Sequence, residues 1–423
     1  MKDDRKPRPG FPAAGLPREQ VMAELEAARG GDADWRGGRV PLFVFKGSDA
    51  VSDIGQAAFD AYFHENALGG ARAFPSVGGF ERDVVAMALD LFGAPETGAG
   101  FMTSGGSESI VMAVKAARDW ARQQGRSNRS APANIVLPES GHPAFDKAAV
   151  LMDLEVRRVP VAADWRADVA AMDAAADGNT IMVVGSAPCF PFGVIDPIAA
   201  LADMTRARDL WLHVDACVGG YLAPFARANG RPVPAFDFSV PGVTSLTADL
   251  HKYGFCPKPA STVLYADARR AACQPFAFDC WPSGPFTTAT VVGTRPAGGV
   301  AGAWAVLRHL GAAGYREIAR ELMAGVDRYR AGVAAIPGLN VLGDPELAIV
   351  AVQSNVVDVF AVAARLQVRQ WVPGLLRRPP ALHRMMSMLH VQSMDDYLAD
   401  LEAAVSEERA DPGGFGRSRA RYS

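Results

Sequence analysis

Between about Phe101 and Tyr265 the chain alternates helical periodicity with short runs of branched apolar residues. This alternation limits the possible folds more than any other feature of the sequence. Amphipathic stretches such as "SIVMAVKAARDWAR" are separated by runs such as "NIVLP", "TIMVVG", "WLHVDA" and "STVLYAD". Continuous apolar runs between such helices predict a mostly parallel β-sheet with helices on both faces. Ligands of these sheets bind at the carboxyl ends of the strands, so the residues that follow each run are the candidates for chemistry.

The rest of the chain predicts smaller units around this sheet. Beyond Gly311 a helical stretch leads into "GLNVLG", "LAIVAVQS" and the amphipathic "DDYLADLEAAV", which together predict a smaller α+β domain. We expect an N-terminal arm and helical segment over 1–75, a large domain over 76–310, a small C-terminal domain over 311–405 and a flexible tail over 406–423.

Composition limits the partners and the compartment. A net charge of −3 with 21% charged residues gives no basic excess for a nucleic-acid partner. The five cysteines lack CxxC spacing, which argues against a disulfide framework and against a metal site, and favours a reducing cytoplasm. The N-terminus "MKDDRKPRPGFP" lacks the apolar segment of a signal peptide, and no later run reaches the length of a membrane span. We expect a cytoplasmic protein without a stable membrane anchor.

The first candidate site is the glycine turn in "MTSGGSESIVMAVKAAR". Thr103 and Ser104 offer hydroxyls, Gly105 and Gly106 let the backbone approach a ligand, and Ser107 opens a helix. The N–H groups and the positive end of that helix would suit a phosphate. Taken alone, a capped helix after a glycine turn explains the motif equally well.

Three further candidates follow other apolar runs. Asp215 in "WLHVDACVGGYL" is a strand-end carboxylate that needs a positive partner, either a structural cation or a protonated ring nitrogen. Lys252 in "SLTADLHKYGFCPKPASTVLY" is either a turn lysine or an amine held for chemistry, and His142 in "GHPAFDKAA" is either a packing residue or a flat ring for stacking. With the glycine turn, these residues supply the contacts that pyridoxal 5′-phosphate requires: a phosphate cradle, a stacking ring, a carboxylate and an amine for a Schiff base.

At these residues the sequence resembles the fold-type I pyridoxal phosphate enzymes of the group II decarboxylase superfamily, and most closely the sphingosine-1-phosphate lyases. The resemblance runs from about Val44 to His390 and rests on "FPSVGGFERDVV", "TSGGSESI", "HPAFDKAA", "SAPCFPFGVIDPI", "HVDACVGGYL", "TADLHKYGFCPKPAST", "DCWPSGPF", "GTRPAGGVAGAW" and "PPALH". It implies the fold-type I PLP-dependent transferase fold, an α/β fold with a mostly parallel seven-stranded sheet flanked by helices. It also implies a homodimer that acts on a small-molecule amine at sites on the subunit interface.

The resemblance implies a role for each candidate. Lys252 is similar to the lysine that forms the Schiff base, Asp215 to the partner of the pyridine nitrogen and His142 to the ring that stacks on the cofactor. Lys258 resembles the second lysine of the lyase motif, near the substrate. The residues implied to bind the cofactor are Ser104, Gly105, Gly106, Ser107, His142, Asp215, Cys217, His251 and Lys252, with Gly293 and Thr294 supplied by the partner subunit.

The chain departs from the lyase pattern where the substrate is expected. Gly69 and Gly70 replace a His-Pro pair, Phe192 in "FPFG" replaces a histidine and Phe286 replaces a tyrosine. A phenylalanine neither transfers a proton nor donates a hydrogen bond. We therefore expect a more apolar pocket that suits a phosphorylated head group less well.

The leading interpretation is a lyase that cleaves a 2-amino-3-hydroxy compound by a retro-aldol reaction to an aldehyde and an amine. An amino-acid decarboxylase of the same fold is the alternative, and an arginine placed for the substrate carboxylate would favour it. Four arginines are available for that role: Arg295, Arg377, Arg378 and Arg384. A homologue without catalytic activity would not need Lys252, Asp215 and His142 together.

Overall fold

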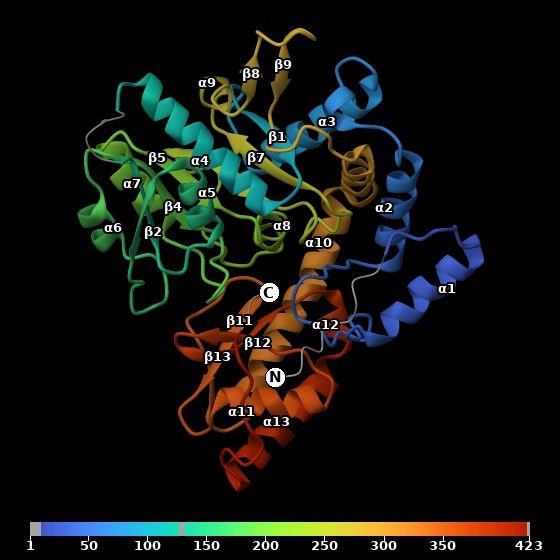
Figure 1. The fold of residues 1–423 in the computed structure, drawn as a ribbon. Coiled ribbons are helices and arrows are strands. Elements are labelled where there is room, and N and C mark those ends of the chain that lie inside the picture. Colours follow the sequence, from blue (N-terminus) through green and yellow to red (C-terminus); the bar gives the residue numbers. More distant parts are fainter. Residues whose placement is uncertain (1–9, 127–131, 421–423) are drawn as a thin grey trace.

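A computed structural model of the chain describes residues 10–126 and 132–420. Its centre is a seven-stranded sheet in the order β1-β7-β6-β5-β4-β2-β3 (Figure 1). The strands are β1 (Ala99–Thr103), β2 (Asn134–Pro138), β3 (Glu155–Val159), β4 (Thr180–Ser186), β5 (Trp211–Asp215), β6 (Val243–Ala248) and β7 (Ser261–Tyr265). Only β7 runs antiparallel to its neighbours within this sheet, so the predicted mostly parallel sheet is confirmed.

The apolar runs are continuous because both faces of the sheet are covered. Ile135 and Leu137 of β2 pack with helices α4 and α5, whereas Val136 between them packs on the opposite side in the cluster that includes α7. The helices around the sheet are α3 (Pro75–Leu91), α4 (Gly106–Gln123), α5 (Ala144–Met152), α6 (Val169–Ala175), α7 (Ile198–Ala207), α8 (Ala223–Ala228) and α9 (Ala268–Ala271). The expected alternation of strands and helices is therefore present.

A smaller α+β unit follows, as expected. Its antiparallel sheet has the order β10-β11-β13-β12. The elements are β10 (Leu339–Val341), β11 (Ile349–Ser354), α11 (Val359–Val368), β12 (Gly374–Arg377), β13 (Pro380–Met385), α12 (Met388–Gln392) and α13 (Met394–Ala410). Because α13 continues to Ala410, the part of the expected tail over 406–410 is helical and not frayed; residues 421–423 of that tail lie outside the described residues.

Helix α10 (Ala297–Ala335) runs from the large unit into the small one (Figure 1). Gly311 interrupts it with φ +54° and ψ −177°, a conformation that glycine adopts more readily than other residues. This break lies where we placed the boundary between the large and small domains. The division into domains itself stays a prediction.

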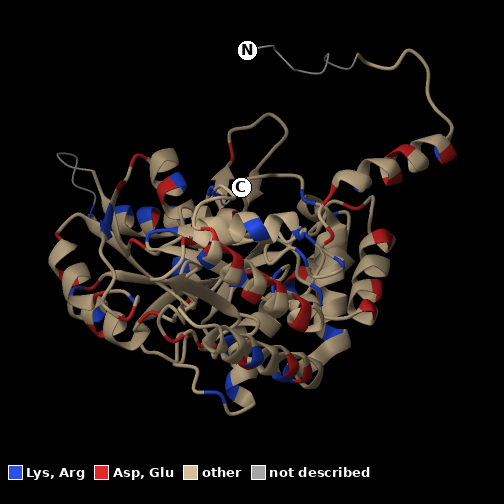
Figure 2. Cartoon of the chain, turned by 90° about the horizontal axis from the view of Figure 1, so that it is seen from below, with Lys and Arg blue, Asp and Glu red and all other residues tan. Residues whose placement is uncertain are grey.

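The N-terminal segment contains α1 (Arg18–Ala28), α2 (Asp49–Ala61) and the short 3-10 turns Arg29–Gly31 and Ala67–Gly69. Helix α2 packs on α10, where Gly298 approaches the backbone of Phe59. Helix α1 has no buried residue and projects from the body of the chain (Figure 2). Residues 1–9 of the predicted arm lie outside the described residues.

A hairpin of β8 (Phe276–Phe278) and β9 (Phe286–Thr288) leaves the body with large apolar side chains exposed, among them Phe276, Phe278 and Trp281. Acidic and basic residues are interspersed along the helices and loops drawn in Figure 2. Within 10–126 and 132–420, no helix combines the length and apolar character needed to cross a bilayer.

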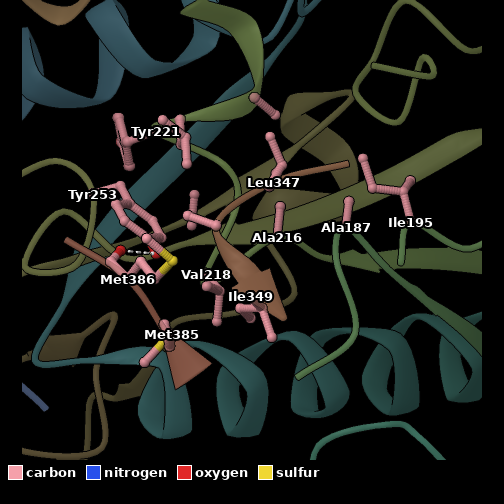
Figure 3. Close-up of a cluster of buried hydrophobic side chains, with 14 of the residues drawn as sticks. Ala187, Ile195, Ala216, Val218, Tyr221, Tyr253, Leu347, Ile349, Met385 and Met386 are labelled. Atoms are coloured by element: carbon pink, nitrogen blue, oxygen red, sulfur yellow. Dashed lines mark hydrogen bonds between the residues drawn. The ribbon is translucent and has the colours of Figure 1, made fainter. Parts of the chain in front are cut away.

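The small unit meets the large one directly behind the carboxyl end of β5. There Ala216 and Val218 form a buried apolar cluster with Ile349 of β11 and Met385 of β13 (Figure 3). Tyr253 extends into the same cluster, and its hydroxyl donates a hydrogen bond of 2.7 Å to the carbonyl of Met386. The residue after Lys252 is thus bonded to the small unit.

Candidate active site

Lys252 and Asp249 form an ion pair at the end of β6. The Asp249 Oδ2 atom lies 2.9 Å from Lys252 Nζ, and the Asp249 side chain is only 2% exposed. Burial lowers the pKa of the Lys252 ammonium, but Asp249, with smaller contributions from Cys217 and Asp215, more than offsets burial, so that this pKa is raised. Burial raises the pKa of the Asp249 carboxyl. Lys252 and His251 lower it by more, so the net shift of this pKa is downward. The pair therefore consists of a partly buried ammonium and a buried carboxylate.

Asp215 ends β5 one strand away and is 7% exposed. Its Oδ1 accepts a hydrogen bond of 3.1 Å from the backbone N–H of Cys217, which turns the carboxylate toward the pocket. Burial, with the nearby Asp215 and Asp249 carboxylates, raises the pKa of the Cys217 thiol, so this thiol stays neutral. This position would let Asp215 pair with a protonated ring nitrogen, a role that stays a prediction.

His142 approaches the pocket from the loop before α5. Its Nδ1 accepts a hydrogen bond of 3.1 Å from the N–H of Ala144, so the neutral ring carries its proton on Nε2. Burial lowers the pKa of this imidazole despite the opposing effect of Asp215, which favours the neutral ring. A neutral flat ring in this position can stack on an aromatic cofactor.

The glycine turn lies at the N-terminus of α4. A Cβ atom at Gly106 would lie 2.8 Å from Asp249 Oδ2 and 3.0 Å from Cys217 Sγ, so no larger residue fits without displacing the carboxylate. The first N–H groups of this 18-residue helix lack acceptors within the helix and point out of its positive end. A phosphate group suits this position.

His251 forms the wall opposite the turn, with Cε1 only 3.4 Å from the Cβ that Gly105 would carry. Its Nδ1 donates a hydrogen bond of 2.7 Å to the carbonyl of Ala260, which fixes the ring. Burial lowers the pKa of the His251 imidazole although Asp249 opposes that shift.

Glu108 connects the glycine turn to a distant segment. Its Oε2 accepts a hydrogen bond of 2.7 Å from the N–H of Ser104, and its Oε1 accepts from the N–H groups of Val291 and Val292 at 2.9 and 3.3 Å. The segment leading to Gly293 is thus fixed to the glycine turn of the same chain.

These residues line one cavity of about 410 Å³. Its walls include Ser104, Gly105, Gly106, Ser107, Glu108, His142, Ser186, Asp215, Cys217, Asp249, His251 and Lys252. An anion-binding helix end, a buried carboxylate, a flat neutral ring and a buried amine converge there. The residues fit pyridoxal phosphate, and the predicted residues of the chain's own half of the site are all present.

Other predicted residues lie outside this cavity. Lys258 Nζ donates a hydrogen bond of 2.8 Å to the carbonyl of Phe43, and burial lowers the pKa of its ammonium. Thr294 accepts a hydrogen bond of 3.2 Å from Asn66, close to Gly69, and Gly293 lines a separate surface hollow with Phe286. Within one chain these residues do not meet Lys252.

Sequence reasoning missed Asp249 and Glu108. Asp249 precedes the lysine by three residues in "TADLHK", directly after a buried strand, and a strand-end carboxylate beside a candidate lysine was a usable signal. The role of Glu108 depends on contacts with Val291, 183 residues away, and had no local signal.

The candidate carboxylate-binding arginines lie away from the cofactor pocket. Arg295 is paired through both nitrogens with Glu81, at 2.9 and 3.2 Å. Arg384 is buried in the small unit, where its guanidinium lies 3.7 Å from the centre of the Tyr397 ring. Arg377 and Arg378 are at the exposed turn between β12 and β13.

Comparison with known proteins agrees with this geometry. Residues 70–354 match the family model of the pyridoxal-dependent decarboxylase conserved domain. The chain is 39% identical to the sphingosine-1-phosphate lyase of Oryza sativa subsp. japonica over 98% of its own length and 77% of that protein.

Solved structures are similar as well. The sphingosine-1-phosphate lyase Bpss2021 of Burkholderia pseudomallei superimposes with a TM-score of 0.91 and 35% identity, over 95% of this chain and 94% of that one. The glutamate decarboxylase of Lactobacillus brevis shares the fold, with a TM-score of 0.82 and 20% identity over 95% of each chain.

Proposed function

Because the chain belongs to the pyridoxal-dependent decarboxylase family, and within it to the sphingosine-1-phosphate lyases, we propose that it cleaves a long-chain 2-amino-3-hydroxy substrate of the phosphorylated sphingoid-base class. It is a pyridoxal phosphate-dependent carbon–carbon lyase, and its products are an aldehyde and an amine. The observation that carries the proposal is the convergence of Lys252, Asp249, Asp215 and His142 on one pocket.

Each residue has a separate task in this proposal. Pyridoxal phosphate, when bound, supplies a conjugated ring that withdraws electrons from the bonds of the amine-bearing carbon. Asp215 would keep the ring nitrogen protonated, His142 would stack on the ring, and the N-terminus of α4 with His251 would hold the phosphate.

We assign the two proton transfers of the reaction to Lys252. Because the pKa of the Lys252 ammonium is raised, this group must first release its proton to solvent. The neutral Nζ would then take the proton of the β-hydroxyl while the Cα–Cβ bond breaks and the aldehyde leaves. Asp249, 2.9 Å away, stabilises the ammonium that results. The same ammonium then returns a proton to Cα, so that the cleavage is balanced in atoms and charge.

We extend the proposal to assembly and location. A homodimer would bring Gly293 and Thr294 of one subunit over the phosphate site of the other, and Lys258 toward its substrate. The exposed apolar hairpin of β8 and β9 and the position of Thr294 outside its own chain's pocket support this arrangement. The five cysteines, all of them free thiols, support a cytoplasmic location.

Decarboxylation remains the competing outcome of the same pocket. It requires a cation at the substrate carboxylate, and the described lining of the cofactor pocket contains no arginine. Arg295 and Arg384 are held by Glu81 and Tyr397 instead. These positions favour cleavage of Cα–Cβ.

The test is a product assay with the purified holoenzyme. It should release a long-chain aldehyde and an amino-alcohol phosphate from a phosphorylated sphingoid base, and no carbon dioxide from amino acids. A visible absorbance band should disappear on borohydride reduction and be absent in Lys252→Ala. Carbon dioxide release without an aldehyde would identify a decarboxylase, and a protein that takes up no cofactor would contradict both activities.

A further inference from the structure

A second and larger cavity, of about 1010 Å³, adjoins the cofactor pocket. The two cavities share His142 and Phe190 as walls. A substrate held beside Lys252 would reach the larger cavity by passing these two rings. None of the roles proposed above uses that space.

The lining of the larger cavity is apolar in large part. It comes from the loops after β2 and β4, from the end of β3, from β12 and from the two terminal segments. The apolar residues are Leu42, Pro143, Val159, Pro160, Phe190, Pro191, Phe192, Leu375, Leu376 and Ala420, and the buried Ser140 and His383 lie among them. Such a surface gains free energy by taking aliphatic groups out of water.

Two aromatic contacts fix these walls in place. Phe192 is 4% exposed and packs on Trp165 with 4.8 Å between ring centres. Phe190 lies 4.5 Å from the His383 ring, and His383 Nε2 donates a hydrogen bond of 2.8 Å to the Phe190 carbonyl. Burial lowers the pKa of His383 to about 4, so this ring is neutral at neutral pH. The walls are thus preformed.

Charged groups also line the cavity. Arg377, Arg378 and Glu139 are exposed, whereas Arg158 and Asp146 are partly buried and paired with each other. The three exposed residues form a charged rim where the cavity meets solvent.

We propose that this cavity binds the aliphatic chain of the substrate, and that Phe190, Phe192 and Leu376 determine the preference for chain length. The inference rests on the proposed function. It assigns a binding site to the part of the substrate that leaves as the aldehyde. It also gives a physical role to Phe192: an apolar ring contacts methylene groups in water-free surroundings, whereas a histidine would have to be desolvated.

The test uses a series of 2-amino-3-hydroxy phosphates that differ only in chain length. Each added methylene should raise kcat/KM by about fourfold, the equivalent of about 0.8 kcal/mol per buried methylene, until the chain reaches the charged rim. Leu376→Gln should lower kcat/KM for long chains by at least about tenfold and leave short chains within about twofold. The half-exposed position of Leu376 favours a folded variant.

Two control variants distinguish a change in chain-length preference from a general loss of activity. Leu376→Met keeps an apolar wall and should retain the preference for long chains. Val368→Gln changes an apolar residue that is 67% exposed at the end of α11, outside the cavity, and should behave as wild type. Equal losses for long and short chains in Leu376→Gln would overturn the proposal.

A binding measurement on the holoenzyme makes the result independent of turnover. Saturated alkyl phosphates from hexyl to octadecyl lack the amine and cannot react, and their affinity by calorimetry should rise with chain length in wild type and flatten in Leu376→Gln. Chain-dependent binding without cleavage of any substrate would contradict the proposed function and keep the cavity assignment. Cleavage with no dependence of binding on chain length would reject the cavity assignment alone.

Discussion

Asp249 is fixed between Lys252 and Ser261: its Oδ2 lies 2.9 Å from Lys252 Nζ, and its Oδ1 accepts a hydrogen bond of 2.6 Å from Ser261 Oγ. The carboxylate is thus bonded to the reactive amine on one side and to β7 on the other. The amine keeps its position through a neighbour that the sheet itself holds.

Asp249→Asn should change the protonation of Lys252. Without the carboxylate, burial of Lys252 is no longer offset and the pKa of its ammonium falls. Because the neutral amine reacts with pyridoxal phosphate, the pH profile for appearance of the visible band in the apoenzyme should move at least about 1 unit to lower pH. Asp237→Asn is the control. It removes a buried carboxylate that lies 3.3 Å from Arg227 and does not line the pocket, so the pH profile should not shift. An unmoved profile in Asp249→Asn would show that the ion pair does not control the lysine.

Gly106→Ala should weaken cofactor binding by at least about tenfold, because the new methyl group would lie 2.8 Å from Asp249 Oδ2. Titration of the apoenzyme with pyridoxal phosphate measures the affinity. Gly178→Ala is the matched control, since no atom lies within 4 Å of its added Cβ. Equal cofactor affinities of the two variants would contradict the claim that Gly106 is needed for the close approach of the turn to Asp249.

If each active site contains residues of both subunits, two inactive variants should restore activity to each other in a mixed dimer. Lys252→Ala removes the reactive amine, and Gly293→Asp places a carboxylate where the partner's phosphate is proposed to bind. Each variant alone should be inactive, whereas co-expression should restore about one quarter of the activity, because half of the dimers would be mixed and each would hold one intact site. Mixed dimers with no recovered activity would show that each chain completes its own site.

The free energy of unfolding should fall in acid through His383. Its folded pKa is about 4, lowered by burial from the usual 6.5, so between these values the unfolded chain binds a proton that the folded chain does not. Stability from this residue is therefore lost as pH falls from about 6.5 to about 4, at about 1.4 kcal/mol per pH unit. His383→Gln keeps a donor for the Phe190 carbonyl and should flatten the slope by that amount in urea denaturation. Parallel slopes for variant and wild type would contradict the assignment.

The sequence was sufficient to predict the residues that follow strands. Asp215 and Lys252 come after β5 and β6, and His142 and the glycine turn come after β2 and β1. Since parallel strands end at the same edge of the sheet, these residues had to meet once the alternation was recognised. The mostly parallel sheet and the cofactor followed from the same pattern.

The larger cavity could not be predicted in this way. It forms where β12 of the small unit faces Phe192 of the large unit, and no periodicity in either segment specifies that contact. The hydrogen bonds from Glu108 to Val291 and from Lys258 to Phe43 likewise join segments that are distant in the sequence. Such pairings depend on tertiary packing, and local sequence patterns do not predict them.

The small unit is attached to the large one at both sides of the pocket. The Tyr253 hydroxyl bonds to Met386 beside the reactive lysine, and His383 bonds to Phe190 beside the larger cavity. A hinge motion that swung the small unit outward would have to break both bonds and expose the apolar cluster of Figure 3 to water. The small unit therefore keeps its position relative to Lys252 and Phe190 for as long as both bonds remain.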